Sequence, residues 1–66
     1  MTIDQRLRKL RYQRGWTIRG LAKIALVDHN TIFNVEMGRG NPTWKVIRKL
    51  SEAFGLTVSE FLEGVR

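Results

Sequence analysis

The stretch TIRGLAKIALVDHNTIFNVE, residues 17–36, decides the fold of this chain. Thr17 suits the N-cap of one short helix, whose apolar residues lie within about two turns: Leu21, Ala22, Ile24 and Ala25. The apolar pattern then breaks, and Asp28 suits the N-cap of a second helix in which Ile32 and Val35 face inward. The segment therefore predicts two short helices joined by a turn of roughly three or four residues.

A further helix is predicted before this segment. Thr2 and Gln5 fit a capping box, with the threonine as the N-cap residue. One face of this helix carries a stripe of four residues at helical spacing: Ile3, Leu7, Leu10 and Arg14. Gly15 ends the helix, because glycine adopts the left-handed conformation of a helix C-terminus without a Cβ penalty.

Two more helices are predicted after residues 17–36. Residues 38–42 give the strongest loop signal, Thr43 caps the next helix, and Thr57 with Glu60 forms a second capping box that opens a short last helix. The residues expected to face inward are Trp44, Ile47, Leu50 and Phe54, followed by Phe61 and Leu62. No stretch alternates as a strand does. The sequence therefore predicts an all-α fold, a compact bundle of five short helices in one domain over residues 1–66.

The composition excludes several classes of protein. The 66 residues include no cysteine and one histidine, so disulfides, thiolate metal centres and nearly all zinc sites are excluded. His29 has no catalytic partner at helical spacing and no phosphate-binding loop is recognisable, so we expect no enzyme, no cofactor and no small-molecule ligand. No apolar run is long enough to span a membrane, and no signal peptide follows Met1. We therefore expect a cytoplasmic protein.

The charge balance is strongly basic. Twelve Lys and Arg residues against six Asp and Glu residues give a net charge of +6. Residues 1–33 hold seven basic and two acidic groups, whereas residues 34–66 hold five and four. A small basic domain favours a polyanionic partner, most often nucleic acid, although a solvated charged surface would have the same composition.

Two short helices joined by a tight turn are the layout of a helix-turn-helix, whose second helix enters the major groove of DNA. Here the second helix carries polar or aromatic side chains outside its core positions: His29, Asn30, Thr31, Phe33 and Asn34. Asparagine can bond N6 and N7 of adenine together, histidine can donate to guanine, and a methyl or aromatic edge can contact the thymine methyl group. The same side chains would also suit a helix face that only contacts solvent, so the residues alone leave both interpretations open.

Four stretches together resemble one known family. They are LRKLRYQRGWT (residues 7–17), LA (21–22), VDHNTIFNVEMGRGNPT (27–43) and the tail over residues 50–62. In this order, over roughly residues 5–62, the chain resembles the phage-repressor and Cro-like helix-turn-helix family, the XRE class. The resemblance implies a five-helix fold that binds double-stranded DNA operators, usually as a symmetric dimer, and regulates transcription, most often as a repressor.

The resemblance also implies roles for single residues. His29, Asn30 and Asn34 occupy positions at which the family reads bases. The residues that occupy positions near the DNA backbone are Thr17, Arg19, Arg39, Asn41, Thr43 and Arg11. Arg11 also occupies, with Glu36, the positions of an ion pair between the first and third helices.

Three residues depart from the family pattern. Leu26 stands where the turn usually has glycine, and a left-handed residue with a Cβ costs about 1 kcal/mol. Ile18 stands where a glutamine usually bonds a phosphate, so that contact is either lost or replaced by Arg19. Gly20 stands where glutamate is frequent, and glycine inside a helix costs about 1 kcal/mol relative to alanine. The second helix and the turn therefore depart further from the family pattern than the third helix does.

One recognition helix reads roughly four or five base pairs, too few for a unique address in a genome. We therefore expect a weak homodimer on a palindromic operator, with half-sites about 34 Å apart. Val58 is expected to point outward from the last helix and to form the dimer contact, with Leu56 as a further participant. The alternatives are a protein-interaction module of the same architecture and an engineered fold without an evolved DNA target.

Overall fold

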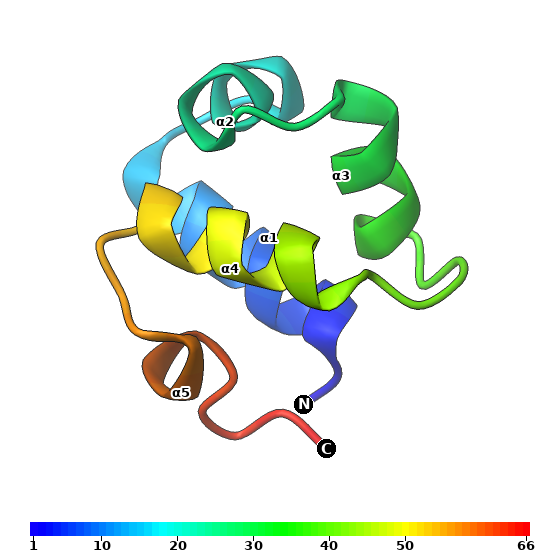
Figure 1. Cartoon of the computed structure of the whole chain (residues 1–66), viewed down its shortest axis with the longest axis vertical. Coiled ribbons are helices and arrows are strands. Elements are labelled where there is room, and N and C mark those ends of the chain that lie inside the picture. The colour runs from blue at the N-terminus through cyan, green and yellow to red at the C-terminus, as the bar shows by residue number, and fades with distance from the viewer.

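Five α-helices make up the computed structural model, which describes residues 1–66 (Figure 1). They are α1 (Ile3–Arg14), α2 (Ile18–Ala25), α3 (His29–Glu36), α4 (Trp44–Ala53) and α5 (Val58–Phe61). The structure contains no strand, so the prediction of an all-α bundle of five short helices is confirmed. None of the five helices is both long enough and apolar enough to cross a membrane.

Capping side chains fix the starts of α2, α3 and α4. The hydroxyl of Thr17 accepts a hydrogen bond from the backbone N–H of Gly20 at 2.9 Å, and the carboxylate of Asp28 accepts one from Asn30 at 2.7 Å. Thr43 caps α4 in the same way, at 3.2 Å. Each cap satisfies an N–H group that no helix carbonyl reaches, so these helices begin where the sequence predicts.

The two predicted capping boxes are present at α1 and α5. In α5 the N–H of Glu60 donates to the Thr57 hydroxyl at 3.1 Å, while the N–H of Thr57 donates to the Glu60 carboxylate at 2.9 Å. The bond from the Thr57 backbone lowers the pKa of Glu60, because it favours the charged carboxylate. In α1 the N–H of Thr2 donates to the Gln5 side chain at 3.1 Å.

One apolar core joins the five helices. Its eleven buried residues are Leu7, Leu10, Leu21, Ala22, Ala25, Ile32, Val35, Ile47, Leu50, Phe54 and Phe61. Aromatic rings stack within it: the ring centroid of Phe54 lies 5.4 Å from that of Trp16 and 6.2 Å from that of Phe61. Because α3 packs on both α1 and α2, this core fixes which face of α3 points outward.

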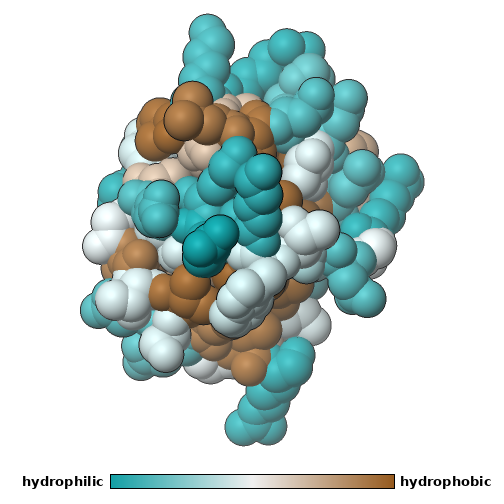
Figure 2. Space-filling view, in the orientation of Figure 1, coloured by the Kyte–Doolittle hydropathy of each residue, from teal (hydrophilic) through white to brown (hydrophobic).

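Two large apolar residues of the predicted helices are exposed: Trp44, which was expected to face inward, and Ile24. Trp44 is 62% exposed, because it is the first residue of α4 and helix side chains lean toward the N-terminus, beyond the core. Ile24 is 49% exposed, because it lies about a quarter of a turn around α2 from the buried Ala25. Figure 2 shows hydrophobic surface gathered over α2, where Ile24 and Leu26 are the exposed large apolar residues.

The packing of α5 also corrects a prediction. Phe61 is buried as expected, but Val58, expected to point outward, is half-buried against the core. Leu56 and Leu62 are half-buried in the same way. Val58 and Phe61 are three residues apart and share the inner face of this single turn, whereas Ser59 and Glu60 are exposed on its outer face. The apolar surface that α5 offers to a second molecule is therefore smaller than expected.

Three arginines of α1 bind backbone carbonyl groups at the C-terminal ends of other helices. The pairs are Arg6 with Glu60 and Phe61, Arg8 with Glu36, and Arg14 with Phe54. The last carbonyls of a helix lack helical partners and carry partial negative charge, so a guanidinium group is well placed there. Much of the positive charge in the first half of the chain thus holds helices together.

Candidate nucleic-acid interface

The turn between α2 and α3 is built on a left-handed leucine. Leu26 has φ +59° and ψ +45°, a conformation that glycine adopts more easily, and its side chain is 77% exposed. The carbonyl oxygen of Leu26 accepts a hydrogen bond from the Lys49 ammonium group at 3.2 Å. The turn therefore has its left-handed geometry without a glycine, and the Lys49 side chain of α4 binds its backbone.

The outward face of α3 carries most of the predicted base-reading residues. Asn30, Phe33 and Asn34 are exposed, whereas His29 and Thr31 are half-buried at its edges. The opposite face is closed by buried residues: Ile32, Val35 and Glu36. The exposed side chains are therefore free to meet a partner without disturbing the core.

Arg11 and Glu36 form the ion pair expected between α1 and α3. The Nε of Arg11 donates to Glu36 Oε2 at 2.6 Å, and a second guanidinium nitrogen donates to Oε1 at 2.8 Å. These bonds raise the pKa of Arg11, because the carboxylate stabilises the charged guanidinium. Both residues are buried, so this pair locks the inner side of α3 to α1.

The same geometry corrects the phosphate contact expected of Arg11. The third guanidinium nitrogen donates to the carbonyl oxygen of Trp16 at 2.9 Å, so each nitrogen has a partner within the protein. The residue is only 8% exposed. Arg11 is therefore a structural residue, whose guanidinium group is enclosed by its partners in the protein.

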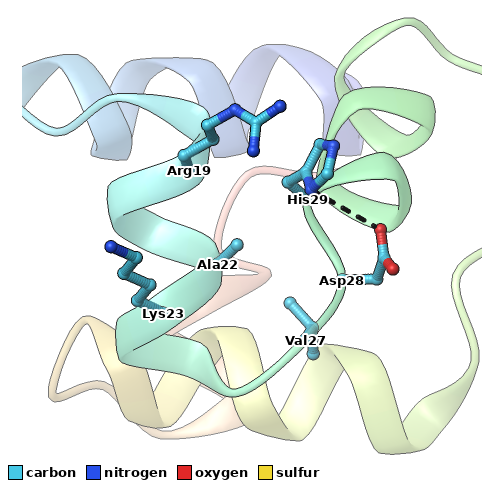
Figure 3. Close-up of a pocket in the computed structure, with 6 residues that line it drawn as sticks. All are labelled: Arg19, Ala22, Lys23, Val27, Asp28 and His29. Atoms are coloured by element: carbon cyan, nitrogen blue, oxygen red, sulfur yellow. Dashed lines mark ion pairs between the residues drawn. The ribbon is translucent and has the colours of Figure 1, made fainter.

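A hollow of about 320 Å³ lies between α2 and the start of α3 (Figure 3). Arg19 and Lys23 line it from α2, one turn apart, and His29 lines it from α3. In Figure 3 the Arg19 guanidinium extends toward the ring of His29, whose Nδ1 lies 3.9 Å from Asp28 Oδ1. The Lys23 side chain extends away from His29 in the same view, so Arg19 is the cationic group directed into the hollow, where it is chemically suited to a phosphate group.

Lys23 lines this hollow, although the sequence analysis did not single it out. Its signal was the spacing of four residues from Arg19, which places both side chains on one face of a helix. At the start of the same helix, Thr17 is exposed and caps α2, whereas Ile18 is half-buried against the core. Ile18 therefore contributes to packing, and Arg19 is the exposed side chain beside it.

A second hollow, of about 270 Å³, lies between α3 and the loop that leads to α4. It brings together five of the predicted site residues: Thr31, Asn34, Arg39, Asn41 and Thr43. The backbone N–H of Arg39 donates to the carbonyl oxygen of Asn34 at 2.9 Å, which keeps the loop beside the end of α3. Arg39 is the one charged residue of this hollow, and it is exposed.

The known proteins that are similar to this chain are described as helix-turn-helix proteins. A family model described as Helix-turn-helix matches residues 7–61. The HTH-type transcriptional regulator DdrOP3 of Deinococcus deserti is 35% identical over 65 residues, which are 98% of this chain and 50% of that protein. The HTH-type transcriptional regulator PuuR of Escherichia coli is 32% identical over 57 residues, which are 86% of this chain and 31% of that protein.

The chain thus spans half the length of the first relative and about a third of the second. The family match covers most of the chain, including the two helices and the turn that the capping residues define. The chain belongs to the XRE-type helix-turn-helix family.

Proposed function

We propose that this protein binds double-stranded DNA sequence-specifically and regulates transcription, with α3 in the major groove. The observation that carries this proposal is the arrangement around α3. Two exposed asparagines, Asn30 and Asn34, lie on its outward face. The hollow on one side is lined by Arg19 and Lys23, and the hollow on the other side by Arg39. The two relatives named above, both called transcriptional regulators, support the same function.

Base reading is assigned to the outward side chains of α3. The amide of Asn30 or Asn34 can accept from adenine N6 and donate to adenine N7 in one contact. His29 at the first turn can donate to guanine, while Thr31 and Phe33 offer a methyl group and an aromatic edge to thymine. Each is exposed or half-buried, so none needs the core to rearrange before it contacts a base.

Backbone contacts are assigned to the two hollows. Arg19 would neutralise a phosphate on one side of α3, near the N-terminus of α2 that Thr17 caps, and Lys23 would add positive charge from the last turn of α2. Arg39, with Asn41 and Thr43, would hold a phosphate on the other side. Contacts of this kind fix the position of α3 on the duplex but carry no sequence information themselves.

The number of base pairs that one α3 can contact favours a homodimer. One α3 reads too few base pairs for a unique address, so we infer a weak homodimer that forms on a palindromic operator and acts as a repressor. Val58 and Leu56 remain the proposed contact, and their half-buried side chains leave only a small apolar surface for it. A surface this small supports association on DNA more readily than in free solution.

Selection of binding sites from random duplex DNA tests this proposal. We expect a defined consensus sequence, with affinity that falls steeply as salt concentration rises, because bound phosphates release counterions. A protein that binds another protein through α3, or a fold without a DNA target, would select no consensus. Failure to enrich any sequence at low salt would therefore refute the proposed function.

A further inference from the structure

The outward stripe of α3 is half apolar. Asn30, Phe33, Asn34 and Met37 follow one another at i, i+3, i+4 and i+7, which places them on one face of a helix. All four are exposed, with Phe33 at 42% and Met37 at 53%. The stripe therefore alternates two amides with two large apolar side chains.

Met37 belongs to this stripe although it follows the last residue of α3. Its backbone N–H donates to the carbonyl oxygen of Phe33 at 2.9 Å, so helical geometry continues to this position. Gly38 then takes φ +71° and turns the chain away. The Met37 side chain thus extends the outward face by one turn beyond Asn34.

The fold gives Phe33 and Met37 no packing role. Neither belongs to the core or to the half-buried residues that pack against it. The ordinary residue on the solvent side of a surface helix is polar, and two adjacent apolar side chains there expose surface that a partner can cover. The basic residues in the flanking hollows, Arg19 and Lys23 on one side and Arg39 on the other, make DNA the partner that the surroundings favour.

We propose that Met37 joins Phe33, to which a thymine contact is assigned above, in reading thymine C5-methyl groups in the major groove. The inference rests on the proposed function and specifies it. An A·T pair offers an adenine edge that suits an asparagine amide and a thymine methyl group that suits an apolar side chain. The two amides and the two apolar residues of the stripe would then recognise the same kind of base pair, so the half-site beneath the second half of α3 is rich in A·T pairs.

The test removes single methyl groups from the DNA. The starting duplex is the consensus selected by the unaltered protein, and each thymine is replaced in turn by uracil, which lacks the C5-methyl group but keeps the O4 acceptor. We expect affinity to fall about fourfold at one or two positions, the factor that corresponds to one buried methyl group. Replacement at thymines outside the α3 footprint should leave the affinity unchanged.

Protein variants assign the effect to the residues. In Phe33→Gln and Met37→Gln the thymine and uracil duplexes should bind equally well at the position that each residue reads. Ile24→Gln is the matched control, because Ile24 is an equally exposed apolar residue on the neighbouring helix α2. It should keep the full difference between the two duplexes. All three sites are exposed, so thermal unfolding should confirm that each variant remains folded.

The outcomes separate this inference from the proposed function. If no consensus is selected, the proposed function itself fails. If a consensus is bound but no thymine can be replaced with loss of affinity, or if both glutamine variants keep the full thymine preference, the methyl-reading role of Phe33 and Met37 is refuted while the function stands. Unaltered DNA recognition in both variants would instead point to a protein partner for this apolar surface.

Discussion

At the scale of single residues, the most consequential contact is the ion pair between Arg11 and Glu36. Both side chains are buried, and the carboxylate binds two nitrogens of the guanidinium group. Glu36→Ala leaves that charge buried without compensation, so we expect the free energy of unfolding to fall by about 3–5 kcal/mol. Urea-induced unfolding measures the loss.

A double variant provides the control for this prediction. Arg11→Met combined with Glu36→Leu removes both charges and keeps apolar volume, so it should cost less stability than Glu36→Ala alone. An unchanged unfolding free energy in Glu36→Ala would show that the pair is exposed to water in solution, which contradicts the packing described above.

Leu26 concentrates backbone strain at one position. Its positive φ costs about 1–2 kcal/mol for a residue with a Cβ, and its exposed side chain contributes little burial. Leu26→Gly should therefore stabilise the fold by about 0.5–1 kcal/mol, after the larger entropy that glycine loses on folding is subtracted. The hydrogen bond from Lys49 reaches a backbone oxygen and survives the change. Leu26→Ala keeps the strain, so a gain in both variants would show that strain is not the cause.

At the scale of whole helices, the basic residues divide into two groups. Arg6 of α1 donates to the carbonyl oxygens of Phe61 and Glu60, each at 2.9 Å, whereas Arg39 lies in the exposed loop after α3. Arg6→Gln should lower the unfolding free energy by about 1.5–3 kcal/mol and leave the salt dependence of DNA binding unchanged. Arg39→Gln should leave the unfolding free energy unchanged. It should reduce the slope of log K against log salt by about one unit.

The two substitutions are chemically identical, so each is the control for the other. Binding measured at several salt concentrations, together with urea unfolding, distinguishes them. Equal loss of salt slope in both variants would mean that α1 also contacts the DNA backbone. An unchanged slope in Arg39→Gln would remove Arg39 from the interface.

At the scale of the whole molecule, size limits what one copy can read. The protein measures 26 × 24 × 21 Å, less than the roughly 34 Å that separates successive major grooves on one side of a duplex. One molecule therefore presents α3 to one half-site, and two copies on a palindrome should bind cooperatively. Titration of a full palindrome and of a single half-site checks this: equal affinity for both duplexes would exclude the dimer model.

The sequence predicted local features better than long-range ones. Helix starts depend on capping residues such as Thr17 and Asp28, whose bonds span two or three positions, and these were predictable. The buried state of Arg11 depends on which helices pack together, so helical spacing alone did not predict it. The inward position predicted for Trp44 was wrong, because the first residue of α4 leans beyond the core. Lys23 was missed because its role depends on a hollow that only the packing of α2 against α3 creates. The outward position of Asn30 and Asn34 followed from the inward spacing of Ile32 and Val35.

The central claim is that α3 reads base sequence, and Asn34→Ala tests it most directly. Asn34 is exposed on the outward face and contributes nothing to the core, so the fold should be unaffected. Affinity of the purified protein and of the variant is measured on the selected consensus and on unrelated duplex DNA at one salt concentration. We expect Asn34→Ala to lose about 1–3 kcal/mol of binding free energy on the consensus and almost none on unrelated DNA. An equal loss on both duplexes, or no loss on the consensus, would contradict the claim.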